Sequence, residues 1–141
     1  MYVQYFIVGI MGLTSVMKLL APGGIAKEFW FVPGWSWPLL GAYQLLTVYL
    51  MHVQNDYAAA APLIYVFLGG AIYSMAKAGK LVAAPFPLFT AVCAWSATLV
   101  RNNTDTASHI APYMGLGFVA ALVLCTLFGA SARPAKKAKS A

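Results

Sequence analysis

The chain has 141 residues, of which 62% are hydrophobic and only 9% are charged. A soluble domain carries about 25% charged residues, so this composition excludes a water-facing globule and indicates an integral membrane protein built as one compact domain. The net charge of +6 does not indicate a nucleic-acid partner, because four of the nine basic residues lie in the last nine positions and most of the others flank apolar runs.

Five apolar segments follow one another and predict an all-α fold, a helical transmembrane bundle with five spans. A helix needs about 20 residues to cross the hydrocarbon core. Four segments reach this length or come close to it, and the fourth is the shortest. We expect residues 1–130 to form a single transmembrane domain and residues 131–141 to form a flexible basic tail. The segments are 2–20, 37–54, 58–78, 85–100 and 107–129.

The first segment contains one charge, Lys18, close to its C-terminal end. A lysine at mid-membrane costs about 2.5–3.5 kcal/mol on insertion scales. Near the edge, its four-carbon stem lets the ammonium group reach the interface. We therefore interpret Lys18 as a membrane anchor rather than as a charge buried for chemistry.

The linker 21–36 is the only long one, and five aromatic rings crowd into positions 29–37. Amphipathic rings of this kind settle at the level of the lipid head groups. The pattern predicts a short interfacial segment on the bilayer; the alternative is a lid over a cavity between the helices. The predicted membrane anchors are Lys18, Trp30, Trp35, Trp37, Lys77 and Lys80.

The second segment contains Gln44, the most interior polar residue of the chain. If buried, it needs partners on other helices, for which Thr14, Ser15, Tyr73 and Ser74 are candidates. The simpler interpretation is a hydrogen bond between helices. The functional alternative is a contact with a quinone carbonyl or a lipid head group.

Two histidines, His52 and His109, fall near the non-cytoplasmic ends of the second and fifth segments. If they faced one another, their imidazole nitrogens could bind haem or a pigment. His52 also lies one turn before Asp56, a spacing that suits metal ligands on a continuing helix. Two interfacial histidines without a ligand are the simpler interpretation.

Small residues recur at fourfold spacing in the third and fifth segments. In lipid, where no hydrophobic force drives helices together, such residues let backbones approach closely. We expect these faces to be helix contacts or, if they point outward, a docking surface for another membrane protein. The predicted packing residues are Gly70, Ser74, Gly115 and Gly117.

The distribution of basic residues favours five crossings over four. If all five segments cross, eight basic residues lie on one side and only Arg101 on the other; if the fourth does not, the count becomes four against five. Because cytoplasmic loops carry the excess of Lys and Arg, we expect the N-terminus to be non-cytoplasmic and the C-terminus cytoplasmic. The eight residues are Lys18, Lys27, Lys77, Lys80, Arg133, Lys136, Lys137 and Lys139.

The chain has three acidic residues, Glu28, Asp56 and Asp105, and all three fall in predicted loops. A proton-coupled pump or transporter normally keeps a carboxylate within the membrane, so this class is disfavoured. The final residues, KAKSA, match a K-x-K-x-x retrieval pattern, which in a eukaryote would indicate the endoplasmic reticulum. The alternative is a solvated basic tail that also meets anionic lipid.

Four stretches carry a family resemblance. GLTSVMKLLAP closes the first segment, GWSWPLLGAYQLL opens the second, and FLGGAIYSMAKAG and PFPLFTAVCAWSATLVR cover most of the third and fourth. Together they resemble the DoxX-like family of small multi-pass membrane proteins over roughly residues 5–101. The resemblance implies a four-helix core, to which the fifth segment is extra.

Two departures from the family pattern affect what the resemblance implies. Gln44 stands where the family usually has a glutamate, and Tyr73 and Ser74 stand where it often has a histidine or another polar group. Any proton or redox chemistry of the family core would lack its titratable members here. The family is named for a subunit associated with quinone-linked sulfur oxidation, and its eukaryotic relatives include chaperones and cargo receptors of membrane proteins.

The leading functional hypothesis is a non-enzymatic accessory, scaffold or chaperone-like subunit that packs against other membrane proteins in the bilayer, within a larger complex. It rests on the lack of titratable core residues, the small-residue faces and the basic tail. The alternative is a redox subunit that binds quinone or haem through Gln44, His52 and His109. A small-solute carrier ranks third, because intramembrane charges and internal repeats are lacking.

Overall fold

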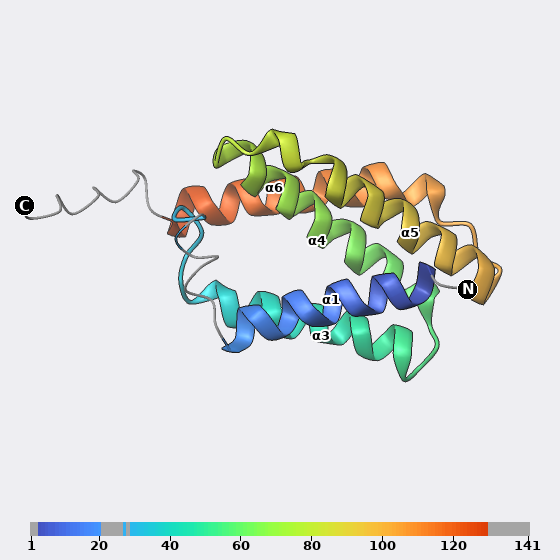
Figure 1. Cartoon of the computed structure of the whole chain (residues 1–141). Helices are drawn as coiled ribbons and strands as arrows, with labels where there is room; N and C mark the ends of the chain where they lie inside the picture. The colour runs from blue at the N-terminus through green and yellow to red at the C-terminus, as the bar shows by residue number, and fades with distance from the viewer. Residues whose placement is uncertain (1–2, 21–26, 28, 130–141) are drawn as a thin grey trace, which may run out of the picture.

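A computed structural model of the chain describes residues 3–20, 27 and 29–129, and this part is all-helical (Figure 1). The all-α prediction is therefore confirmed. Glu28 and the basic tail with its retrieval pattern lie outside the described residues. The elements are α1 Val3–Leu20, α3 Ser36–His52, α4 Tyr57–Lys77, the 3₁₀ helix η1 Leu81–Ala83, α5 Pro85–Asn102 and α6 Ala107–Phe128.

Local sequence signals set the ends of these helices. Asn55 adopts a left-handed conformation (φ 51°) after α3, and Asp56 caps α4 by accepting a hydrogen bond from the Ala59 N–H at 3.0 Å. Pro85 occupies the first turn of α5, where a missing N–H costs little, and left-handed Asn103 ends that helix. Each helix begins and ends within two residues of its predicted apolar segment.

Three helical segments are long and apolar enough to cross a membrane, as expected of a multi-pass membrane protein. Helix η1 extends the fourth predicted segment, the shortest one, into a candidate span of 22 residues. α1 is a shorter apolar helix, and α3 has 17 residues and includes the polar Gln44 and His52. Five spans therefore stay a prediction. The three qualifying segments are Tyr57–Lys77, Leu81–Asn102 and Ala107–Phe128.

The helices lie side by side in an up-and-down arrangement, so the start of α1 and the end of α6 are at opposite ends (Figure 1). At one end of the bundle, α1, α4 and α6 finish and α3 and α5 begin. This end carries Lys18, Lys77 and Lys80, and we call it the cationic end. The far end carries Arg101 and Asp105. The described charges thus separate between the two ends, as the sequence predicts.

Four helices form a closed ring, because α1 packs on α3, α3 on α4, α4 on α5 and α5 back on α1. α6 packs against α4, and most of its surface is exposed. The core is apolar and includes Ile7, Met11, Ile64 and Tyr65. α4 is the central helix, because it touches three of the others.

The crossing of α4 and α6 depends on glycine. A Cβ atom at Gly69 would overlap the backbone of Met114, and one at Gly117 would overlap the backbone of Val66. The two helix backbones therefore touch, as close packing through small residues requires. Gly70 lies beside this crossing, with room for a Cβ at 3.7 Å from the Ala121 Cβ.

The other two predicted packing residues lie elsewhere. Gly115 is exposed, and nothing lies within 4 Å of the place where its Cβ would be. Ser74 donates its hydroxyl to the Gly70 carbonyl oxygen (3.0 Å) within its own helix. The fourfold spacing identified the correct pair of helices, but on α6 only Gly117, and not Gly115, faces α4.

Candidate functional site

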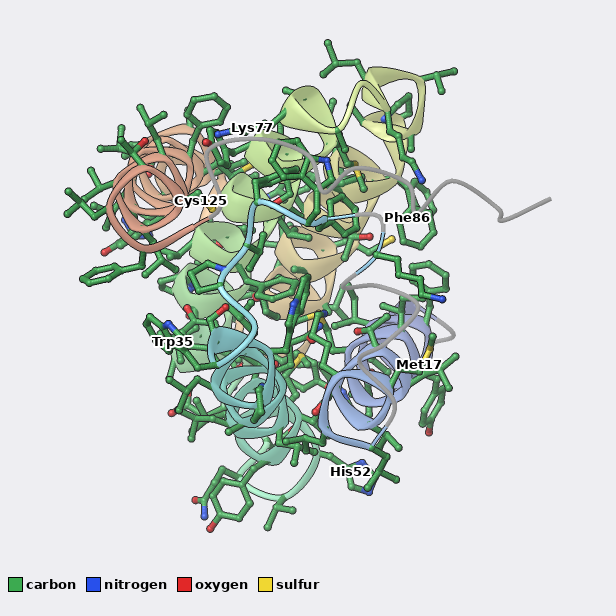
Figure 2. The ribbon with its side chains drawn as sticks, turned by 90° about the vertical axis from the view of Figure 1, so that its left-hand side faces the viewer. Met17, Trp35, His52, Lys77, Phe86 and Cys125 are labelled. Carbon is green, nitrogen blue, oxygen red and sulfur yellow. The ribbon has the colours of Figure 1, made fainter. Side chains whose placement is uncertain are left out.

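A cavity of about 440 Å³ opens among the helices at the cationic end. Figure 2 looks onto this end, with Trp35 and Cys125 on one side and Met17 and Phe86 on the other. All five long helices contribute to its wall, and so does the segment between α1 and α3. The wall is mostly apolar, and its described polar members include Thr14, Lys18, Trp37, Tyr43 and Gln44. We call it the end cavity.

A chain of hydrogen bonds between α1 and α3 forms the polar part of the wall. The Lys18 ammonium Nζ donates to Gln44 Oε1 at 2.6 Å, and Gln44 Nε2 donates to Thr14 Oγ1 at 2.7 Å. Thr14 in turn donates to the Ile10 carbonyl oxygen at 2.8 Å. Gln44 Nε2 also lies 3.7 Å from the sulfur of Met11. Of the partners predicted for Gln44, the structure therefore supplies Thr14.

Lys18 points inward, in contrast to the outward anchor that the sequence predicts. Only 8% of its surface is exposed, and its Nζ lies 4.6 Å from the centroid of the Phe67 ring on α4. The other contact of the ammonium in the described part of the chain is Gln44. The described carboxylates, Asp56 and Asp105, belong to the far end. The cavity thus contains a cation with no acidic partner among the described residues.

Trp37 was predicted to be an interfacial anchor, but it is buried, with 5% of its surface exposed. It is the second residue of α3 and follows Ser36, whose hydroxyl donates to the Pro33 carbonyl oxygen at 2.6 Å. Its ring lines the end cavity, and its indole N–H has no acceptor within the described residues. A buried donor without a partner is rare and costs about 1–3 kcal/mol.

The aromatic segment before α3 folds over the end of the bundle. Phe31 is fully buried, meets the Tyr73 ring edge-on at 6.2 Å between centroids, and lies under Lys77, whose Nζ is 5.4 Å from its ring. Phe29 and Val32 line the end cavity. The described part of the segment therefore lines the cavity, as the lid alternative expects, and its position relative to a bilayer stays a prediction.

The remaining predicted anchors are more exposed. Trp35 is exposed and its ring packs edge-on against Phe128 at 5.9 Å, and Trp30 is half-buried against Phe31. The Lys77 side chain is exposed, and Lys80 is half-buried. Their position at the cationic end agrees with an anchoring role, which stays a prediction.

The two histidines do not form a site with one another. His52 is exposed at the last residue of α3, and His109 is exposed in the first turn of α6, with its ring edge-on to Tyr113 at 5.7 Å. α3 and α6 are not among the helix pairs that pack closely. Because α3 ends at His52 and Asp56 caps the next helix, the continuing helix needed for a His52–Asp56 metal pair is also lacking. No cluster of metal-binding side chains occurs in the described ranges.

At the far end, polar side chains form hydrogen bonds between neighbouring elements. The Asn102 side-chain oxygen accepts from the Tyr57 N–H at 2.7 Å, and its amide donates to the Asn55 carbonyl oxygen at 3.1 Å. The Tyr65 and Thr106 hydroxyls share a hydrogen bond of 2.7 Å. These bonds tie α4 to α5 and to the connection before α6.

Asp105 lies in the exposed connection between α5 and α6. It accepts hydrogen bonds from the Ala107 backbone N–H (2.9 Å) and from the Trp95 indole N–H (2.8 Å). These two bonds hold the pKa of the Asp105 carboxyl below its ordinary value of 3.8. The carboxylate therefore bonds to the first backbone N–H of α6 and to α5, at an exposed position.

Comparisons with protein-family models, with curated proteins and with solved structures return no match for this chain. The DoxX-like resemblance therefore stays a prediction, and the functional argument depends on the geometry of the end cavity.

Proposed function

We propose that this protein is a non-catalytic integral membrane protein that binds one lipid-like or quinone-like molecule in the end cavity. The observation that carries the proposal is the combination of a mostly apolar space of about 440 Å³ with a buried polar cluster on one wall. Small-molecule sites typically occupy about 300–1,000 Å³ and combine apolar walls with a few placed polar groups. Gln44, the predicted contact for a quinone carbonyl or lipid head group, belongs to that cluster.

The haem form of the redox hypothesis has less support than the quinone form. His52 and His109 are exposed on helices that do not pack closely. Axial ligation would need both imidazoles to converge on one iron atom. A quinone needs only an apolar pocket and a hydrogen-bond donor, and the end cavity offers both.

The test is to purify the protein in a neutral mild detergent, extract it with organic solvent and identify what is released by mass spectrometry. We expect one apolar or amphipathic molecule per chain. The variant Ala71→Phe places a ring in the cavity wall, and Val119→Phe adds the same ring to the exposed face of α6. The first should lose the molecule and the second should retain it. Equal recovery from both variants would contradict the proposal.

The accessory-subunit hypothesis is the second candidate, and the exposed surface of α6 supports it. Ala111 and Gly115 are exposed one turn apart, and Gly115 has open space where a Cβ would be. A small-residue face of this kind can receive another transmembrane helix. Cross-linking from a cysteine placed at Gly115 in native membranes tests this: a fixed protein adduct is expected, and labelling by lipid alone would count against it.

We further propose five crossings with the cationic end in the cytoplasm, and membership of the DoxX-like family. The charge separation between the two ends and the closed ring of four helices with α6 outside it support these proposals. A small-solute carrier has no observation in its favour. Labelling of cysteines placed at Asn103 and Ala78 from either side of the membrane should find these two positions in different compartments.

A further inference from the structure

Among the described residues, the wall of the end cavity includes Lys18, whose ammonium has Gln44 as its one hydrogen-bond acceptor, and Trp37, whose indole N–H has none. We infer that the occupant of the cavity is an anionic amphiphile, with a carboxylate or phosphate head that binds the Lys18 ammonium and an apolar chain that fills the rest of the cavity. This inference rests on the proposed function and names the class of ligand. Three steps support it: the direction of the hydrogen bonds, the charge balance and the chemistry of Trp37.

The direction of each hydrogen bond in the Lys18 cluster follows from its neighbours. The Thr14 hydroxyl donates to the Ile10 carbonyl oxygen, so its oxygen is free to accept from Gln44 Nε2. This fixes the amide orientation, and Gln44 Oε1 accepts from Lys18. An ammonium group has three donors and no acceptor. Lys18 therefore keeps donors for a further partner, and that partner must be an acceptor.

The charge balance favours an anion over a neutral acceptor. Lys18 is 92% buried, and its two contacts in the described structure are a neutral amide and the Phe67 ring. A buried charge that lacks an opposite charge is strongly unfavourable, whereas a hydrogen-bonded ion pair compensates much of that penalty. A neutral quinone carbonyl would satisfy the donors but leave the charge without a counter-ion among the described residues. A carboxylate or phosphate oxygen accepts the hydrogen bonds and also supplies the opposite charge.

Trp37 supplies an independent second observation. Its ring lines the same cavity from α3, next to the helix that carries Lys18, and its buried indole N–H has no acceptor among the described residues. An indole nitrogen only donates. Within the described residues, the Trp37 indole therefore lacks an oxygen acceptor, whereas the Lys18 ammonium has one acceptor, Gln44, and keeps further donors.

The shape of the cavity sets the size of the apolar part. Beyond the polar wall, the lining consists of side chains such as Met11, Phe67, Leu68 and Leu124. A volume of about 440 Å³ lies in the size range of small-molecule sites and has room for an apolar chain. The head then lies near Lys18, close to the cationic end, and the chain extends among the helices.

The experiment measures binding of four probes to the full-length protein in neutral nanodiscs: oleate, oleyl phosphate, oleyl alcohol and decylubiquinone. We expect oleate, oleyl phosphate or both to bind at least about tenfold more tightly than oleyl alcohol, a difference in the range of a charge-assisted hydrogen bond. The ratio of oleate to oleyl phosphate distinguishes a carboxylate ligand from a phosphate ligand. Lys18→Gln should remove the preference for the anions and retain binding of the alcohol.

Three further variants complete the test. Lys18→Arg should preserve the anion preference, Trp37→Phe should weaken anion binding, and Arg101→Gln, which removes one exposed positive charge at the far end, should change neither. Equal affinity for the alcohol and the anions, or an unchanged preference in Lys18→Gln, would overturn the inference. Binding of decylubiquinone in preference to both anions would overturn it as well but leave the proposed function in place. Failure of all four probes would contradict the proposed function itself.

Discussion

The two ends of the bundle use buried polar groups in opposite ways. At the far end, Asn102, Tyr65 and Thr106 are paired with partners on other helices or connections. At the cationic end, Lys18 and Trp37 are buried beside the end cavity; within the described ranges Lys18 has one hydrogen-bond partner and the Trp37 indole has none. Polar groups that stabilise a fold are satisfied within it, so the incomplete pairing at the cationic end indicates a site for something else. The predictions below test this difference.

The largest effect should come from the helix crossing that holds both ends together. Gly117→Ala places a Cβ against the backbone of Val66, so the helices must separate. Overpacking of this kind costs about 1–3 kcal/mol and occasionally more. Gly115→Ala is the matched control on the same helix, because its Cβ meets open space. Thermal unfolding in detergent should show a large drop for Gly117→Ala and none for Gly115→Ala; equal drops would contradict the described crossing.

The second-largest loss of stability should come from removing the Asn102 hydrogen bonds at the far end. Asn102→Ala leaves the Tyr57 N–H and the Asn55 carbonyl oxygen without their partner, and we expect a loss of about 1–2 kcal/mol. Gln54→Ala removes a similar amide, but one that bonds only to the exposed Tyr49 hydroxyl, and should cost less than about 0.5 kcal/mol. Unfolding by chemical denaturant in a fixed detergent can measure both. If the two variants lose the same stability, the Asn102 hydrogen bonds do not stabilise the far end.

A pair of conservative variants should change stability in opposite directions. Tyr65→Phe removes the hydrogen bond to Thr106 and should destabilise the protein by about 1 kcal/mol. Trp37→Phe removes an N–H that has no described acceptor, and should stabilise the ligand-free protein by up to about 1 kcal/mol. Melting of delipidated protein gives both values. A loss of stability in Trp37→Phe without ligand would mean that the indole has a partner in the unliganded chain.

The smallest effect is a dependence on pH at the far end. Because the folded-state pKa of Asp105 is lowered, its stabilising contribution is present above the ordinary value of 3.8 and is lost as the pH falls through the lower folded pKa. The melting temperature should therefore fall slightly more in acid for the natural protein than for Asp105→Asn. Identical acid profiles would show that the bonds from Ala107 and Trp95 contribute nothing to stability.

The sequence predicted the helices well because their limits are local. The apolar length of each segment can be read without knowledge of the rest of the chain. For the described residues, the sequence also assigned the charges to the two ends correctly, because the chain reverses direction at each connection. The charge count retained the short fourth segment as a span, and η1 supplies the length that the segment lacked.

The site was predicted only in part, because it depends on which way side chains face and on contacts between distant segments. Thr14 was one of four partners proposed for Gln44 from the sequence, and the structure pairs the two. Lys18 was interpreted from its distance to the helix end and not from the helix face on which it lies. It continues the buried stripe of Ile7, Met11 and Ser15, a signal that was present in the sequence. The burial of Phe31 and Trp37 depends on contacts with helices that follow much later in the chain, so no local pattern could have indicated it.

The central claim, that the end cavity holds a lipid-like molecule, is tested most directly by photo-cross-linking in nanodiscs with an oleate analogue whose chain carries a diazirine. Peptide mapping should find adducts concentrated on residues 10–18 and 66–75, with stoichiometric saturation and competition by unlabelled oleate. Adducts spread without saturation over the exposed face of α6, around Leu116, Val119 and Val123, would mean that the probe only samples the surface, and would contradict the account.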